Sequence, residues 1–365
     1  MGSFALSRLH LTDEAGAVDA NNERWQDNAL ANPVVSTSSN VSLAQIQNSI
    51  DALNSLKLVR MKNFCSIQAI NQVAGDNAKN ILAAYIQTKS DSLATTMVTT
   101  ADIRMPPGNS DYISNMAMCQ SPDTTGSIDD LNSTSLQQTN NANVFPWTQD
   151  QTWQVLSAAM AKDAPVINAA AKQAGADPRM VAAAMFAEQS RLYRTERGLF
   201  KKYLAALQIL AAANQFSLGV MGIKPDTAKE IEKNLTDSSS VYYLGPSYQH
   251  LLDFSTQDQD QERYDRLSSE ADHYYSYLYG ALYIRQVEQQ WASQNIPIAN
   301  RPEIVGTLFN IGFQHSKPHP NPAVGGSVIT IGQTQYTFGS LVYEFYYSGE
   351  LQSEFPYTMA NSMTQ

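Results

Sequence analysis

The stretch Asp177-Pro178-Arg179-Met180-Val181-Ala182-Ala183-Ala184-Met185-Phe186-Ala187-Glu188-Gln189-Ser190 predicts a helix that carries an acid on an apolar face. Asp177 is a favourable N-cap, and Pro178 suits the first helical position, where its missing N–H costs nothing. Residues at three-and-four spacing form one face that is apolar except for its acid: Val181, Ala184, Met185, Glu188 and Leu192.

Glu188 on this face is a candidate general acid. A carboxylate on a buried stripe is costly to ionise, so we expect its pKa to be raised. A raised pKa is what proton donation near neutral pH requires. The alternative is that Glu188 lies at the edge of the stripe and pairs with a nearby Arg or Lys, because structural ion pairs also perturb pKa values.

Composition narrows the classes of ligand. The chain has 365 residues, of which 43% are hydrophobic and only 16% charged, and 24 basic against 34 acidic residues give a formal net charge of -10. This is a globular composition, and an acidic chain is a poor candidate for binding nucleic acid or an anionic membrane, since both need a basic surface. The many uncharged polar residues suit a ligand such as a glycan. Cys65 and Cys119 are either one disulfide or two free thiols.

The chain is expected to fall into four parts. Residues 1–41 read as an extended polar arm, 42–103 as a small helical region, 104–146 as a linker or long loop, and 147–365 as the main domain. In the small helical region we expect three helices: residues 42–61, 65–74 and 78–87, the last with an extension toward residue 97.

The main domain is expected to be mostly α with a minor β-hairpin. Besides the Glu188 helix, helices are expected at residues 153–161, 164–174, 191–213, 228–235, 272–292, 302–309 and 338–348, and strands at 328–331 and 334–338. Thr227 and Glu230 form a capping-box pattern before the 228–235 helix. The tyrosines at 274, 275, 277, 279 and 283 are expected to lie partly in the core, with sugar stacking as the alternative.

Five short motifs in order resemble the soluble lytic transglycosylase pattern of the lysozyme-like superfamily. They are Glu188-Gln189-Ser190, Ser217-Leu218-Gly219-Val220-Met221-Gly222, Pro225-Asp226-Thr227-Ala228, Gly280-Ala281-Leu282-Tyr283-Ile284 and Leu308-Phe309-Asn310-Ile311-Gly312. The chain departs from that pattern by the inserted Gln189, by Gly222 in place of Gln, by Phe309 in place of Tyr, and by a longer stretch between Glu188 and Ser217. The resemblance covers about residues 150–350.

The resemblance implies a lysozyme-like fold and cleavage of the β-1,4 bond between N-acetylmuramic acid and N-acetylglucosamine in peptidoglycan. Glu188 would protonate the leaving oxygen. A lytic transglycosylase then reuses the same Glu as base and forms an anhydro sugar, whereas a lysozyme needs a second carboxylate. Glu196 and Asp226 are the candidates. Glu196 has the alternative role of a solvated partner of Arg194 or Arg197, and Asp226 that of a helix-start residue.

The resemblance also implies substrate-binding residues: Ser190, Ser217, Met221, Tyr283 and Asn310. Asn310 would contact Glu188 or the substrate. Core packing is the alternative for Met221 and Tyr283, and a helix C-cap for Asn310. No cofactor or metal is expected; a zinc site at His315 and His319 lacks a third ligand in the sequence.

Partners and location follow from the same resemblance. Residues 1–8 lack the features of a signal peptide, and no stretch is apolar and long enough to span a membrane. More loosely, the chain resembles the peptidoglycan-cleaving effectors injected through type VI secretion. We therefore expect action in the periplasm or cell wall after export by a secretion system or phage lysis, with peptidoglycan, secretion machinery and an immunity protein as partners. The competing hypothesis is a non-catalytic lysozyme-like module that binds wall or serves in a secretion assembly.

Overall fold

The computed structural model describes residues 43–122, 126–132, 136, 141–195, 219–269 and 271–357. The chain divides into two compact units, whose described parts are residues 146–346 with 350–357 (unit 1) and residues 43–145 with 347–349 (unit 2). The expected polar arm, and residues 196–213 of the helix expected at 191–213, lie outside the described residues. The described residues are mostly helical with one two-stranded antiparallel sheet, which confirms the predicted fold class.

Unit 2 is built from helices α3 (Leu43–Val73), α4 (Gly75–Thr88), α5 (Asp91–Arg104) and α6 (Ser110–Met118). The prediction of two helices over residues 42–74 was wrong, because residues 62–64 contain no helix breaker and α3 runs through them. The predicted extension of the third helix toward residue 97 was also wrong. Lys89, with φ +53°, ends α4, and Ser90 caps α5 by accepting a hydrogen bond from the Leu93 N–H.

A disulfide and a helix occupy the region that the sequence suggested as a linker. α6 forms within residues 104–146, capped by Asn109, whose side chain accepts a hydrogen bond from the Tyr112 N–H. Cys119, directly after α6, is bonded to Cys65 of α3, with their Cα atoms 5.4 Å apart. Of the two alternatives for these cysteines, the structure therefore has the disulfide.

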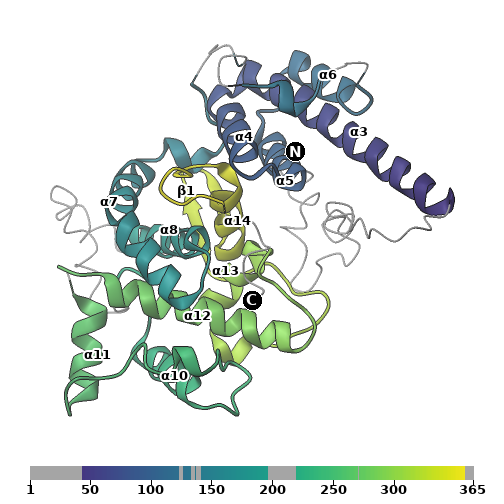
Figure 1. Ribbon diagram of the computed structural model, residues 1–365. Coiled ribbons are helices and arrows are strands. Elements are labelled where there is room, and N and C mark those ends of the chain that lie inside the picture. Colours follow the sequence, from purple (N-terminus) through teal and green to yellow (C-terminus); the bar gives the residue numbers. More distant parts are fainter. Residues whose placement is uncertain are drawn as a thin grey trace. The chain divides into compact units, whose positions relative to one another are not determined.

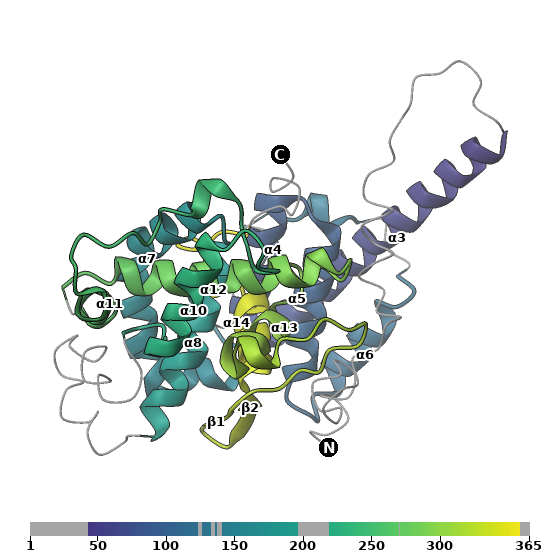
Figure 2. The same ribbon diagram turned by 90° about the horizontal axis from the view of Figure 1, so that it is seen from below.

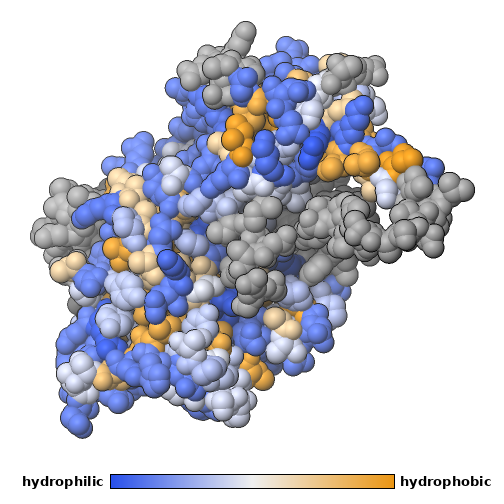
Figure 3. Space-filling view, in the orientation of Figure 1, coloured by the Kyte–Doolittle hydropathy of each residue, from blue (hydrophilic) through white to orange (hydrophobic). Residues whose placement is uncertain are grey.

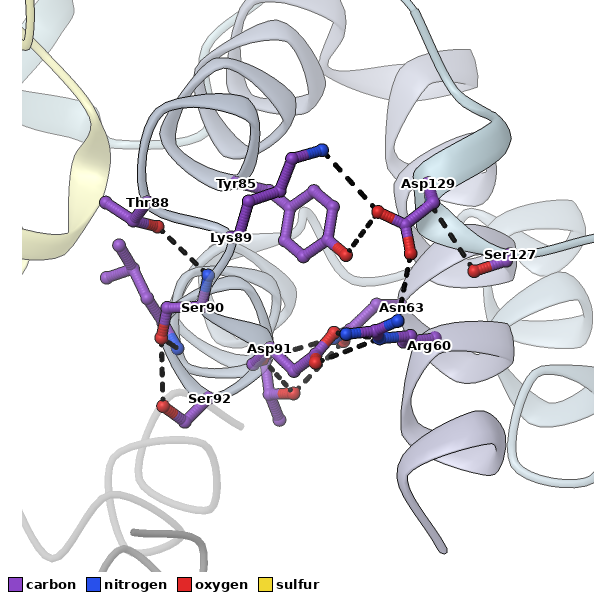
Figure 4. Close-up of polar contacts among 12 residues, drawn as sticks. Arg60, Asn63, Tyr85, Thr88, Lys89, Ser90, Asp91, Ser92, Ser127 and Asp129 are labelled. Carbon is purple, nitrogen blue, oxygen red and sulfur yellow. Dashed lines mark hydrogen bonds and ion pairs between the residues drawn. The ribbon is translucent and has the colours of Figure 1, made fainter. Parts of the chain in front are cut away.

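A network of charged side chains joins three helices of unit 2 and the short helical turn at residues 128–130 (Figure 4). Arg60 of α3 donates from Nε to Asp91 Oδ2 at 3.0 Å and from Nη1 to Asp129 Oδ2 at 3.1 Å. Tyr85 of α4 donates its hydroxyl to Asp129 Oδ1 at 2.8 Å, and Lys89 Nζ lies 3.5 Å from the same oxygen. Each carboxylate is matched by a cation, so the network holds the helices of this unit together.

The N-terminal half of α3 leaves apolar side chains in solvent. Ile50, Leu53 and Leu58 are 45%, 64% and 44% exposed. Figure 2 shows this half of α3 extending beyond the other helices of unit 2, and Figure 3 shows apolar surface along it.

Unit 1 contains the predicted main domain. Its elements are α7 (Gln151–Ala174), α8 (Pro178–Thr195), α10 (Pro225–Thr236), α11 (Gln259–Ser268), α12 (Tyr274–Ser293), α13 (Pro302–Ile311), β1 (Val328–Ile331), β2 (Thr334–Thr337) and α14 (Phe338–Ser348). α12 contacts α7, α8, α10, α11 and α13 and is the centre of this unit (Figure 1). β1 and β2 pair antiparallel, with Ile329 opposite Tyr336, and β1 packs against α8.

Two predictions about helix boundaries in unit 1 were wrong, and each has a physical reason. The helices expected at 153–161 and 164–174 are one helix, α7, which contains Pro165 in its interior. The missing Pro165 N–H costs one helical hydrogen bond, but packing along α12 keeps the helix continuous. The Thr227–Glu230 capping box does not form, because Pro225 fits the first turn and starts α10 three residues earlier, with Lys224 as N-cap.

The core of unit 1 is rich in aromatic side chains. Trp147, Trp153, Phe186 and Phe345 pack together, with ring centroids 4.8–6.2 Å apart. Tyr277, Tyr279 and Tyr283 of α12 are 0%, 0% and 2% exposed, so this part of the tyrosine run belongs to the core. Among the described residues, none of the helices has the length and apolar character that crossing a membrane requires.

Candidate functional site

α8 is fixed at its start by a buried arginine. The Asp177 carboxylate accepts a hydrogen bond from the Arg179 N–H at 2.9 Å, as expected of an N-cap. The Arg179 guanidinium, 0% exposed, donates to the carbonyl oxygens of Phe345, Tyr346 and Phe355 at 3.1, 2.8 and 3.1 Å. The first turn of α8 is therefore tied to the end of α14 and to the segment that follows it.

Glu188 lies within the predicted apolar stripe, and the whole stripe is buried. Val181, Ala184 and Met185 are each 0% exposed and Leu192 is 6% exposed, and Glu188 itself is 4% exposed. A carboxyl group in such surroundings has lost nearly all contact with water. The predicted placement of this acid inside unit 1, rather than at its surface, is what the structure shows.

Glu188 is also paired with Arg191, one turn further along α8. Arg191 donates from Nη2 to Glu188 Oε1 at 2.5 Å and from Nε to Oε2 at 3.1 Å, so both carboxylate oxygens are occupied. Burial raises the pKa of Glu188 above its ordinary value of 4.5, while the hydrogen bonds and charge of Arg191, and the charge of Lys224, oppose that rise. The carboxyl group is thus both buried, as the acid hypothesis expects, and ion-paired, as its alternative expects.

The second motif folds directly against this carboxyl group. Gly222 has φ +63°, and a Cβ atom there would lie 2.8 Å from Glu188 Cγ and would overlap Oε1. Position 222 therefore requires a residue without a side chain, for reasons of both backbone conformation and space. The inserted Gln189 holds the same turn, since its Nε2 donates to the Val220 carbonyl at 2.7 Å.

The second, fourth and fifth motifs also contact one another. Met221 packs on Gly280 of α12, where an added Cβ would lie 3.0 Å from Met221 Cγ. The Met221 N–H donates to Ser276 Oγ of the same helix at 3.3 Å. One turn beyond Gly280, Tyr283 donates its hydroxyl to the Leu308 carbonyl of α13 at 3.2 Å, and its ring lies 5.3 Å from that of Phe309.

The residues expected to bind substrate are mainly interior. Ser190, Met221 and Tyr283 are 1%, 0% and 2% exposed, and Ser190 Oγ has no hydrogen-bond partner among the described residues. Asn310 is half-buried at the end of α13, and its Oδ1 accepts from the N–H and the hydroxyl of Ser327 at 2.7 and 3.1 Å. Within the described part of the chain, no hydrogen bond joins Asn310 to Glu188, because its acceptor faces the loop before β1.

Of the two candidates for a second catalytic carboxylate, Glu196 and Asp226, the structure describes only Asp226. Glu196 and Ser217 both lie outside the described residues. Asp226 is exposed in the first turn of α10, a position where an acid complements the helix dipole. Among the residues that the structure describes, no three His, Cys, Asp or Glu side chains are grouped as a metal site would need.

Sequence reasoning did not place Arg191, Gly222 or Lys224 next to Glu188, although Gly222 belongs to the second motif. The signal for Arg191 was present, since a residue three positions after Glu188 on a helix lies on the same side and an arginine there pairs with it. The contact of Gly222 joins segments far apart in the chain, and no local pattern reports it.

Comparisons of the chain with protein-family models, with curated proteins and with solved structures find no match. The resemblance to lysozyme-like enzymes therefore rests on the five motifs themselves.

Proposed function

We propose that unit 1 is a peptidoglycan glycosidase that cleaves the β-1,4 bond between N-acetylmuramic acid and N-acetylglucosamine, with Glu188 as general acid. The observation that carries the proposal is a chain of contacts between motifs. Glu188 of the first touches Gly222 of the second, Met221 of the second touches Gly280 of the fourth, and Tyr283 of the fourth bonds to Leu308 of the fifth.

General-acid catalysis requires a carboxyl group that keeps its proton until the glycosidic bond breaks. Burial supports this, because it disfavours the ionised form of Glu188 and raises its pKa. Glu188 would donate its proton to the leaving oxygen, and positive charge would develop on the sugar ring. In a hydrolase a water then attacks. In a lytic transglycosylase the deprotonated Glu188 instead takes a proton from the sugar's own 6-hydroxyl, which closes the anhydro ring.

The disulfide of unit 2 supports action outside the cytoplasm. Disulfides persist in oxidising compartments such as the periplasm and are rare where thiols are kept reduced. The Cys65–Cys119 bond thus fits a protein that meets peptidoglycan in the periplasm or cell wall. Secretion machinery and an immunity protein are proposed as partners from the looser resemblance to injected peptidoglycan-cleaving effectors.

The Arg191 pair favours a second candidate, a non-catalytic module that binds wall or serves in a secretion assembly. A carboxylate whose two oxygens both accept hydrogen bonds from one guanidinium is a common structural ion pair. In that case Glu188 would contribute to stability alone, and the protein would bind glycan strands without cutting them.

Digestion of purified peptidoglycan separates the two candidates. The wild-type protein, Glu188→Gln and the control Asp265→Asn, which removes an exposed carboxylate from α11, are incubated with cell-wall sacculi. We expect release of soluble fragments by the wild type and the control, and a loss of about 10²–10⁴-fold in Glu188→Gln, which keeps its fold. Mass spectrometry of the fragments then identifies anhydro or reducing ends. Full activity in a folded Glu188→Gln protein would refute the assignment, and binding without fragments would favour the second candidate.

A further inference from the structure

We propose that the disulfide between Cys65 and Cys119 is a redox-controlled latch on helix α6. In an oxidising compartment the bond holds α6 against α3. Reduction of the bond releases residues 105–122, while α3, α4 and α5 stay folded. The inference concerns unit 2 alone, so it is independent of the proposed glycosidase activity of unit 1.

The helix α6 is too short and too sparsely packed to stay in place without help. It has nine residues, Ser110–Met118, whereas an isolated helix shorter than about 12–15 residues is marginal in water. Within this fully described helix Tyr112 is the one buried residue, at 4% exposed, while Ile113 and Met118 are 58% and 63% exposed. Neither helix formation nor burial of apolar surface therefore accounts for the docking of α6.

Two side-chain hydrogen bonds join α6 to its neighbours within the described part of the chain. Tyr112 donates its hydroxyl to Asp102 Oδ1 of α5 at 2.7 Å, and Asn115 donates from Nδ2 to Gln72 Oε1 of α3 at 2.9 Å. The second bond is exposed, so water competes for both of its partners. These hydrogen bonds orient α6, and a covalent bond supplies the third tie.

The disulfide fixes the C-terminal end of α6 on α3. Cys119 directly follows α6 and is 1% exposed, and Cys65 lies in α3 with its Cα atom 5.4 Å from that of Cys119. α6 contacts α3 (Figure 1). A cross-link removes much of the conformational freedom that an undocked segment would regain, and this favours the docked state.

The segments on both sides of α6 are anchored without the disulfide. Before it, Met97 and Ala101 of α5 are each 1% exposed. After it, Ile128 is 0% exposed, and Asp129 accepts a hydrogen bond from Arg60 Nη1 of α3 at 3.1 Å. Opening of the disulfide therefore frees a limited stretch between two fixed points rather than the whole of unit 2.

Reduction of the bond is a thiol–disulfide exchange with a thiol reductant such as glutathione or a thioredoxin. Cys65 is half-buried and Cys119 is buried, so we expect a thiolate of the reductant to attack the Cys65 sulfur. Cys119 then leaves as a thiolate and takes up a proton. A second thiolate of the reductant attacks the mixed disulfide, which releases Cys65 as a thiol and leaves the reductant oxidised. Two electrons and two protons pass to the protein, and a disulfide oxidant reverses both steps.

The state of the latch follows the compartment in which the protein is present. Glutathione and thioredoxin keep thiols reduced in the cytosol, whereas disulfides persist in the periplasm and outside the cell. α6 is therefore released while the chain is in a reducing compartment, and it is fixed on α3 after transfer to an oxidising one.

Hydrogen exchange of the full chain measures this release directly. Peptides from α4, α5 and α6 are followed by mass spectrometry in the disulfide-bonded protein and after reduction, and alkylation of a separate sample verifies that both thiols are free. We expect reduction to accelerate exchange within α6 at least about tenfold and to change exchange in α4 and α5 by less than about twofold. Re-oxidation with oxidised glutathione should restore the slow exchange.

Two variants serve as controls. The double substitution Cys65→Ser with Cys119→Ser should give fast exchange in α6 with or without reductant. Tyr112→Phe removes the hydrogen bond to Asp102 and keeps the disulfide, so α6 should stay protected in the oxidised protein.

Three outcomes would overturn the inference. Slow exchange in α6 of the fully reduced protein would show that the disulfide is not the latch. Fast exchange in α6 of the oxidised Tyr112→Phe protein would identify the hydrogen bond to Asp102 as the tie that holds. Equal acceleration across α4, α5 and α6 would mean that the disulfide stabilises unit 2 as a whole. None of these outcomes bears on the cleavage of peptidoglycan.

Discussion

Replacement of Gly222 by alanine places a methyl group where the structure has the Glu188 side chain. The new Cβ would lie 2.6 Å from Cδ and 2.8 Å from Cγ of Glu188, and it would overlap Oε1. The φ of +63° adds a second penalty, because a left-handed conformation is unfavourable for a residue with a side chain. We therefore expect Gly222→Ala to act on the carboxyl group and on the backbone together.

The two contributions can be separated with a matched glycine. The left-handed conformation costs about 1–2 kcal/mol, and disruption of the charge-assisted hydrogen bonds between Arg191 and Glu188 adds about 1–3 kcal/mol. Gly332, in the turn between β1 and β2, has φ +59° and no atom within 4 Å of an added Cβ. Gly332→Ala should thus show the backbone cost alone, whereas Gly222→Ala should lower the free energy of unfolding by about 2–5 kcal/mol.

Urea unfolding followed by tryptophan fluorescence measures these values, since Trp147, Trp153 and Trp291 are all buried in unit 1. In a Glu188→Ala background the overlap is gone, and Gly222→Ala should then cost no more than Gly332→Ala. If Gly222→Ala and Gly332→Ala are equally destabilising in the wild-type background, the carboxyl group does not lie against this turn. Cleavage of peptidoglycan should fall by about 10²-fold or more, because a displacement near 1 Å has that effect on a reacting group.

Three further predictions concern Glu188, the disulfide and Arg179. Because burial raises the pKa of Glu188, its contribution to stability is fully present below pH 4.5 and is lost as pH rises through the folded-state pKa. Glu188→Gln should therefore gain stability relative to the wild type as the pH rises above 4.5, by about 1.4 kcal/mol for each unit of the rise in pKa. A difference in urea stability that does not change with pH would contradict this. Replacement of both Cys65 and Cys119 by serine opens a disulfide between residues 54 positions apart. This double substitution should lower the free energy of unfolding of unit 2 by about 2–4 kcal/mol in urea titrations. The tryptophan transition of unit 1 serves as the internal control. Arg179→Met should destabilise unit 1 by about 3–5 kcal/mol in thermal unfolding, because buried carbonyls lose their donor. Arg179→Lys should not restore stability, since a single ammonium cannot reproduce the guanidinium fork; full rescue by Lys would argue against the three-carbonyl geometry.

Local signals in the sequence predicted those elements whose boundaries are set locally. Asp177-Pro178 marks the start of α8, and the expected hairpin strands match β1 and β2 to within one residue. Prediction failed where the extent of an element depends on a contact with a segment far along the chain. α7 continues through Pro165 because α12 lies along it, and α12 is more than one hundred residues later in the chain.

The same division applies to the candidate site. The helical spacing of Val181, Ala184 and Met185 was enough to predict a buried Glu188. The sequence analysis allowed a nearby Arg or Lys as a partner, but it named neither Arg191 nor the contacts that occupy both oxygens. The approach of Gly222 depends on how the chain returns after residues outside the described set, and only three-dimensional coordinates reveal it.

The contacts of Arg179 have a consequence for how the protein is made. Its carbonyl partner Phe355 lies 176 residues further along the chain. A ribosome that has just released α8 into solution has not yet synthesised the segment that fixes the first turn of this helix. The first turn of α8 can therefore gain all three of its carbonyl partners only after translation has passed residue 355.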